Sequence, residues 1–140
     1  MKMRLSYVTV LVKDQNAALK FYTQKLGFEK KDDDKSVPGM RWLSVAPKGQ
    51  DDCARIVLSK PSVKMMGAKK AKELMTRVGK NPTWVIETDD CKGQYEALKA
   101  KGVKFTNAPE DMPWGISCVF VDLYGNPYNM VEPKPMPANP

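Results

Sequence analysis

Residues 5–12 read Leu-Ser-Tyr-Val-Thr-Val-Leu-Val, and this stretch, with the Lys13-Asp14 pair that follows it, decides the fold. Its β-branched residues predict a strand over 5–12, and Asp14 is a typical N-cap for a helix. Apolar residues then recur at helical spacing up to Gly27, a residue typical of helix termination in the left-handed conformation. The chain therefore begins with a strand that leads directly into a capped helix.

The order strand, helix, strand, strand, strand occurs twice in the sequence. The further strands of the first copy are expected at about 28–32, 41–46 and 54–59. All four strands of the second copy are expected at about 83–88, 103–106, 117–121 and 127–132. Asp14 corresponds to Asp90, and Gly27 corresponds to Gly102, so the repeat is about 75 residues long. A repeat of this length indicates a duplicated module in which two small curved sheets form one concave surface.

The composition places the chain among small globular proteins. Its 140 residues, of which 42% are apolar and 28% charged, are enough for one core, so we expect a single domain. No apolar run approaches the roughly 20 residues of a membrane span, and the amino-terminal residues lack the apolar block of a signal peptide. We therefore expect a cytoplasmic protein with no membrane partner.

The positive charge is concentrated between the two copies. Residues 60–80 contain seven lysine or arginine side chains against Glu73 alone, which is most of the net charge of +7. Apolar spacing in this segment predicts a short amphipathic helix that begins at about Gly67 or Ala68. No aromatic residue is interleaved with these lysines, so nucleic acid is not an expected partner. The expected organisation is a first module at 4–61, a basic helical connector at 62–81 and a second module at 82–133.

The sequence contains no histidine, which excludes Ser-His-Asp and Cys-His catalysis. It also removes the commonest transition-metal ligand. The three cysteines are odd in number and widely spaced, so neither a disulfide framework nor a paired-thiolate zinc site is indicated.

Two segments resemble the vicinal oxygen chelate superfamily, which includes glyoxalase I, the bleomycin-resistance proteins, fosfomycin-resistance enzymes and extradiol dioxygenases. The first is the opening strand with Phe21-Tyr22 and Leu26-Gly27-Phe28. The second is Pro113-Trp114-Gly115 followed by Phe-Val-Asp-Leu-Tyr-Gly-Asn-Pro at 120–127. The resemblance implies an α+β fold in which two tandem βαβββ modules form a curved mixed sheet around a concave cavity, with helices on the convex face.

The resemblance implies that four strand positions supply the metal ligands in metal-dependent members of the superfamily. Carried over one at a time, these positions fall on Tyr7, on or next to Val57, on Thr83 and on Asn129. Valine has no donor atom, and neutral hydroxyl and amide oxygens are weak ligands beside imidazole or carboxylate. We therefore expect no metal site and no cofactor, and metal-dependent isomerisation and ring-cleaving oxygenation are disfavoured.

If these strand positions point inward, strand alternation predicts which side chains line the concavity. The expected ligand-binding residues are Tyr7, Thr9, Trp42, Thr83, Trp114 and Asn129. Trp42 and Trp114 would offer flat aromatic faces, with core packing as the alternative for Trp42. Glu87 is the one carboxylate expected at an inward strand position, so Glu87 and Tyr7 are the candidates for catalysis.

Three functions remain open at this stage. The leading hypothesis is a metal-free protein that holds a small organic, possibly aromatic, molecule in the cavity, in the manner of drug-sequestering relatives. The second is a small metal-independent enzyme of isomerase, lyase or hydrolase type that uses Glu87 or Tyr7. The third is an interaction domain whose basic connector contacts an acidic partner. The resemblance also implies a homodimer, with each cavity formed within one chain or by modules of two chains.

Overall fold

The first strand leads into a capped helix in the computed structural model of the protein, which describes residues 1–135. Strand β1 (Tyr7–Leu11) is followed by α1 (Gln15–Lys20). The Asp14 carboxylate accepts a hydrogen bond of 3.0 Å from the backbone N–H of Ala17, which satisfies one free donor at the start of the helix. The predicted cap is therefore confirmed.

The helix continues as a π-helical turn, η1 (Phe21–Lys25), and the chain then turns at Gly27 with a φ of +76°. Gly102, after the helix of the second copy, has a φ of +89°. Side chains with a Cβ rarely adopt this conformation, which explains glycine at both helix ends.

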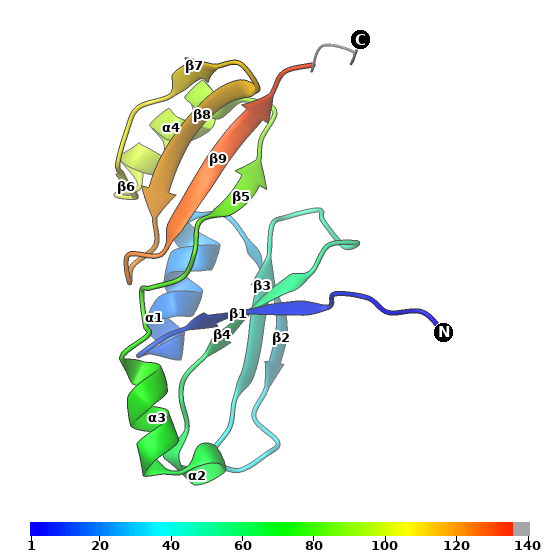
Figure 1. The fold of residues 1–140 in the computed structure, drawn as a ribbon, viewed down its shortest axis with the longest axis vertical. Coiled ribbons are helices and arrows are strands. Elements are labelled where there is room, and N and C mark those ends of the chain that lie inside the picture. The colour runs from blue at the N-terminus through cyan, green and yellow to red at the C-terminus, as the bar shows by residue number, and fades with distance from the viewer. Residues whose placement is uncertain (136–140) are drawn as a thin grey trace. The chain divides into compact units, whose positions relative to one another are not determined.

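Two compact units make up the chain, Met1–Asn81 and Pro82–Pro140. The first contains a four-stranded mixed sheet, here called sheet A, in the order β1-β4-β3-β2. Its other strands are β2 (Glu29–Asp34), β3 (Trp42–Ala46) and β4 (Arg55–Ser59). β1 pairs parallel to β4, whereas β4, β3 and β2 are antiparallel neighbours (Figure 1).

Sheet A buries one set of side chains against α1 and η1. Val10, Tyr22, Leu43, Val45 and Leu58 are all fully buried. α1 packs against β4, and η1 packs against β2. Burial of such apolar side chains contributes about 1.5–3 kcal/mol each, so this core fixes the register of the sheet and the direction of its other face.

The basic segment forms two helices, α2 (Val63–Met66) and α3 (Ala68–Met75), and α3 begins where the sequence predicts. The hydroxyl of Ser62 accepts a hydrogen bond from the backbone N–H of Met65 and donates one of 2.7 Å to the carbonyl oxygen of Gly39. The start of α2 is thereby tied to the loop between β2 and β3.

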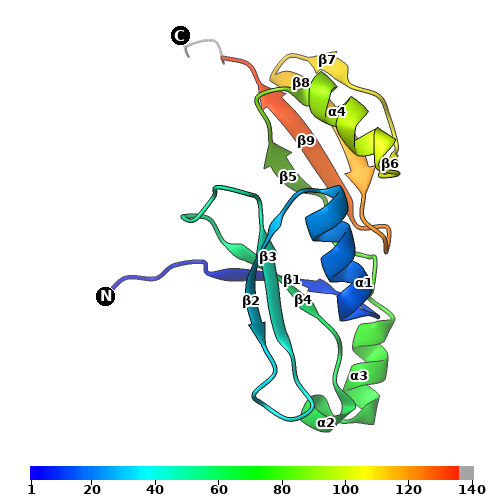
Figure 2. The ribbon, with the colours of Figure 1, turned by 180° about the vertical axis from the view of Figure 1, so that it is seen from behind.

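The second unit repeats the order of the first. Its mixed sheet, sheet B, has the order β5-β9-β8-β6, and a short strand β7 also pairs with β8. The elements are β5 (Trp84–Glu87), α4 (Cys91–Ala100), β6 (Lys104–Phe105), β7 (Glu110–Met112), β8 (Gly115–Val121) and β9 (Pro127–Pro133). Helix α4 covers one face of β8 and β9 (Figure 2). The Asp90 carboxylate caps α4 through the backbone N–H of Gly93 at 2.9 Å.

Two features differ from the sequence-based expectation. Strand β7 was not predicted, and β2 runs to Asp34 although this strand was expected to end at about residue 32. The extension of β2 is held by Arg41, whose guanidinium donates hydrogen bonds of 2.8 and 2.9 Å to the two carboxylate oxygens of Asp33. The α+β class with its two mixed sheets is confirmed. No helix within residues 1–135 is long and apolar enough to cross a membrane.

Candidate functional site

The side chains of β1 alternate between the core and the opposite face of sheet A. Val10 is fully buried, whereas Tyr7 and Thr9 are exposed on the other side, here called the Tyr7 face. Across the sheet, Thr9 pairs with Val57, and Val57 pairs with Ser44. Paired residues in neighbouring strands project to the same side, so these side chains form one row on the Tyr7 face.

Trp42 belongs to the same face. Its ring meets the ring of Tyr7 edge to face, with centroids 5.1 Å apart and an angle of 78° between the planes. The indole is 36% exposed, so it is not a core residue of the unit. The contact holds the indole in one orientation and leaves part of its surface accessible to solvent.

A polar network centred on Asp32 lies beside these aromatic rings. The Asp32 carboxylate accepts hydrogen bonds from the hydroxyl of Ser44 at 2.5 Å, from the hydroxyl of Tyr7 at 3.1 Å and from Nη1 of Arg55 at 3.1 Å. The Ser44 hydroxyl, and after it the guanidinium of Arg55 and the hydroxyl of Tyr7, lower the pKa of Asp32 against the effect of burial. Asp32 is therefore ionised at neutral pH and orients three neighbouring groups.

A β-bulge brings Asp32 to this face. Lys30 pairs with Val45, but the next pair along the strands is Asp32 with Ser44, so Lys31 is the extra residue. A one-residue insertion moves every later side chain to the opposite face of the sheet. Without it, Lys31 would stand opposite Ser44, and Asp32 would point to the core side.

A pocket of about 540 Å³ opens beside Trp42 and lies within the first unit. It is lined by Gln15, Gly39, Met40, Arg41, Trp42, Val57, Ser59, Lys60, Pro61, Ser62 and Val63. The side-chain amide of Gln15 donates to the carbonyl oxygens of Arg41 and Leu58, which holds the start of β3 and the end of β4 together. Pockets of about 300–1,000 Å³ with apolar walls and a few polar groups are the usual size and character of small-molecule sites.

One face of sheet B, here called the Asn129 face, carries the predicted residues Asn129 and Glu87. Asn129 pairs with Val85, and Glu87 lies two positions further along β5 on the same side. The hydroxyl of Ser117 donates a hydrogen bond of 2.7 Å to Oδ1 of Asn129. Val85 and Glu87 are both exposed, and the side chain of Glu87 makes no hydrogen bond or ion pair within residues 1–135.

Two predicted residues lie outside the strands. Thr83 precedes β5 and is exposed, and Trp114 lies in the turn between β7 and β8 with 46% of its surface exposed. The carbonyl oxygen of Trp114 accepts a hydrogen bond of 2.9 Å from the backbone N–H of Lys134. The six predicted ligand-binding residues thus fall into two groups, with Tyr7, Thr9 and Trp42 in the first unit and the other three in the second.

The residues at the ligand positions of metal-dependent relatives do not fit a divalent cation. Val57 offers no donor atom, the hydroxyl of Tyr7 already donates to Asp32, and Oδ1 of Asn129 already accepts from Ser117. Asp32 is the nearest carboxylate to Tyr7, but the guanidinium of Arg55 neutralises it. Among residues 1–135, no group of three or more His, Cys, Asp or Glu side chains could hold a metal ion.

Residues 4–128 match the model of the Glyoxalase/Bleomycin resistance protein/Dioxygenase superfamily. The chain belongs to this superfamily. Protein YetH of Bacillus subtilis (strain 168) is 35% identical to it over 129 residues, which cover 92% of this chain and 98% of YetH.

Two solved structures match this chain over nearly its whole length. UcmS2 has a TM-score of 0.82 and 33% identity, and the match covers 94% of this chain and 99% of UcmS2. TnmS3, described as an antibiotic binding protein from Streptomyces sp. CB03234, has a TM-score of 0.76 and 29% identity over 95% of this chain and 98% of its own. The resemblance noted from the sequence is confirmed by these matches.

Sequence reasoning missed the network around Asp32 and most of the pocket lining. Asp32 and Ser44 were assigned to strands, but only the bulge places them on the Tyr7 face together. Met40, Lys60 and Val63 line the pocket from loops and from the start of α2, where no residue periodicity applies. The one signal in the sequence was the Pro38-Gly39 pair, which marks a tight turn beside the start of β3.

Proposed function

We propose that this member of the superfamily is a small-molecule binding protein that holds a planar organic ligand in the pocket beside Trp42, without a metal ion. The observation that carries the proposal is the pocket itself, in which an exposed indole meets the apolar side chains of Met40, Val57 and Val63. Aromatic stacking on the indole and burial of the ligand against these walls would supply the affinity.

The geometry of Trp42 suits this role. The edge-to-face contact with Tyr7 fixes the indole, so a ligand does not have to immobilise it on binding. Tyr7 is fixed in turn by its hydrogen bond to Asp32. A pre-oriented indole surface favours flat aromatic ligands over flexible aliphatic ligands.

The similarity to TnmS3 supports the proposal at the level of the ligand class. TnmS3 is described as an antibiotic binding protein, and it shares the fold over nearly the whole of both chains. Binding without catalysis also agrees with the chemistry of the site. Val57 has no donor atom that could hold a metal ion. The hydroxyl of Tyr7 already donates a hydrogen bond to the ionised carboxylate of Asp32.

Fluorescence titration with N-phenyl-1-naphthylamine, a neutral aromatic probe whose naphthalene ring is flat, tests the proposal. We expect saturable binding to the full chain, and we expect Trp42→Ala to weaken it about tenfold because the stacking surface is lost. The control is Val37→Ala, which removes an exposed apolar side chain from the loop between β2 and β3, outside the pocket lining. Absence of saturable binding, or equal loss in both variants, would contradict the proposal.

We also propose that the protein is a cytoplasmic homodimer. β1 forms one edge of sheet A, and β2 forms the other. Edge strands carry backbone groups that can pair with a second copy, which supports association between chains. Light scattering during size-exclusion chromatography measures the mass, and a value of one chain, 15.7 kDa, across a tenfold range of concentration would contradict the dimer. The cytoplasmic location stays a prediction.

A further inference from the structure

The charged groups that line the pocket are both cationic. Lys60 and Arg41 contribute to the lining, and no aspartate or glutamate does. The two cations differ in what they contact, and this difference determines which of them is available to a ligand.

Arg41 is satisfied within the protein. Its Nε and Nη2 atoms donate to the two carboxylate oxygens of Asp33 at 2.8 and 2.9 Å, and Nη1 donates to the side-chain oxygen of Asn16 at 2.8 Å. In a bidentate pair of this kind the two opposite charges largely cancel, so the guanidinium attracts an anionic ligand only weakly. The Arg41 side chain therefore forms part of the wall and holds the start of β3.

Lys60 is not satisfied in this way. It follows the last residue of β4 and is exposed, and within residues 1–135 it makes no ion pair or hydrogen bond. The positive charge of this lining residue is uncompensated by a neighbouring carboxylate within the described residues. A ligand with an anionic group can supply the missing partner.

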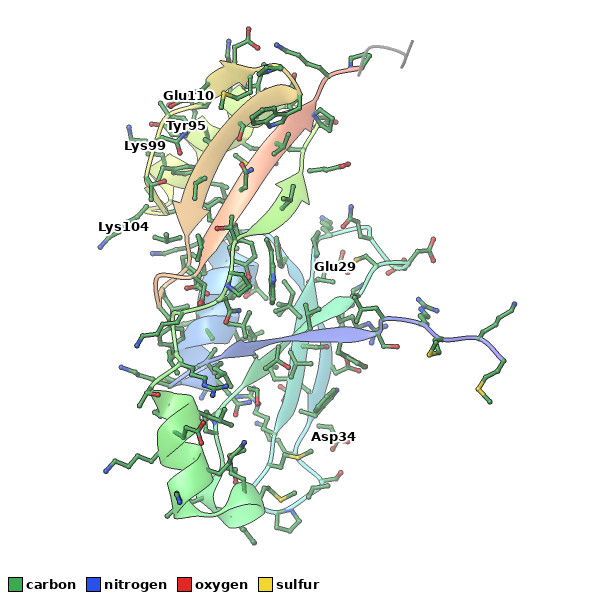
Figure 3. The ribbon with its side chains drawn as sticks, viewed as in Figure 1. Glu29, Asp34, Tyr95, Lys99, Lys104 and Glu110 are labelled. Carbon is green, nitrogen blue, oxygen red and sulfur yellow. The ribbon has the colours of Figure 1, made fainter. Side chains whose placement is uncertain are left out.

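Asp34 lies on the same face as Asp32 and pairs with Trp42 across the two strands. It lies at the end of β2, outside the lining (Figure 3). The side chain of Ser36, and after it the Ser36 backbone N–H that donates to the Asp34 carboxylate at 2.8 Å, lowers the pKa of Asp34 and directs the carboxylate to the loop. Lys64 is a further cation beside the pocket, with its side chain against Gly39.

We propose that the pocket selects planar organic anions, with the ring against Trp42 and a carboxylate or phenolate group beside Lys60. This inference rests on the proposed function and adds the charge class of the ligand. The basic segment 60–80 strengthens it, because the surrounding lysines raise the local concentration of anions before contact.

Competition titrations against N-phenyl-1-naphthylamine with two probes of nearly equal shape, 2-naphthoate and 2-naphthamide, test the inference. We expect 2-naphthoate to bind about threefold to fivefold more tightly than the amide at low salt, as expected of one partly exposed charge pair. The difference should shrink as sodium chloride is added, whereas binding of the amide should stay constant.

Three variants assign the effect to one residue. Lys60→Gln should abolish the preference for the anion, and Lys60→Arg should retain it. Lys70→Gln removes the same charge from α3, outside the pocket lining, and should retain most of the preference. Equal affinity of the two probes for the wild-type protein, or equal loss of the preference in Lys60→Gln and Lys70→Gln, would overturn the inference while leaving the proposed function intact. Failure of both naphthalene probes and of the neutral reporter to bind would overturn the proposed function as well.

Discussion

Ser44 stands directly opposite Asp32 across the β2–β3 pair, and its buried hydroxyl donates a hydrogen bond of 2.5 Å to Oδ2 of Asp32. The same hydroxyl oxygen accepts the backbone N–H of Asp32 at 3.1 Å. One small side chain therefore holds both the backbone and the carboxylate of the residue that orients Tyr7 and Arg55. This relationship connects the β-bulge at Lys31 to the aromatic surface of the pocket.

Ser44→Ala should lower the free energy of unfolding by about 1–2 kcal/mol, because it removes a hydrogen bond to a charged group and leaves a backbone N–H without its partner. It should also raise the pKa of Asp32, since the serine hydroxyl is the largest cause of its lowering. Urea unfolding at pH 7 and an NMR titration of the Asp32 carboxyl measure the two effects. The control, Ser36→Ala in the exposed β2–β3 loop, should change neither. An unchanged pKa in Ser44→Ala would show that this contact does not hold Asp32.

The ion pair between Arg41 and Asp33 should make the protein less stable in acid. Arg41 lowers the pKa of Asp33 from its ordinary value of 3.8 to about 2, chiefly through their hydrogen bonds. The folded state thus binds the proton less readily than the unfolded chain. The stabilisation is present in full above about pH 4 and is lost as the pH falls toward 2.

Solvent screening limits this contribution to about 1 kcal/mol for a partly exposed carboxylate. Arg41→Gln should lower the free energy of unfolding by that amount at pH 7. Between pH 4 and 2, the free energy of unfolding should then fall less in this variant than in the wild-type protein. Urea midpoints at pH 7, 4 and 2 provide the measurement. Arg77→Gln breaks the more exposed pair with Glu73 on α3 and serves as the control. If both variants follow the same pH profile, the Asp33 pair is not the cause of the acid sensitivity.

The fold could be predicted from the sequence because its signals are local. Asp14 and Asp90 cap their helices, and Gly27 and Gly102 end them, as the residue types predict. Strand β7 was missed because Glu110, Asp111 and Met112 show no apolar alternation, and the strand exists only through its pairing with β8.

The site was less accessible to sequence reasoning, because it depends on a register shift and on loops. Trp42 was anticipated as an aromatic face, and the structure places it in the pocket lining. Strand alternation could not place Asp32 beside Ser44, since one extra residue reverses the face of all that follow. Strand alternation also could not place Lys60 and Met40, because these residues line the pocket from loops, where side-chain directions follow no regular pattern.

The three cysteines should differ in their reaction with Ellman's reagent. Cys91 and Cys118 are fully buried, with their sulfur atoms 3.7 Å apart, whereas Cys53 is partly exposed. Burial raises the pKa of the Cys91 thiol, and it raises that of Cys118 to about 12, so neither forms the reactive thiolate at pH 8. We expect one thiol to react quickly in the folded protein and all three to react in denaturant. Cys53→Ser should abolish the fast phase, and rapid reaction of two or three thiols in the folded wild-type protein would contradict the arrangement.

Removal of divalent metal should leave ligand binding unchanged. The donors at Tyr7 and Asn129 are engaged by Asp32 and Ser117, and Val57 has none, so a cation would have to lose its water without gaining strong ligands. We therefore expect the affinity for N-phenyl-1-naphthylamine to be the same before and after dialysis against EDTA, and after addition of zinc or manganese. Metal analysis of the dialysed and reloaded samples after gel filtration is the matching measurement. One tightly held ion per chain, together with a loss of probe affinity on chelation, would mean that metal ligands other than the four strand positions complete the site, and the metal-free binding mode would have to be abandoned.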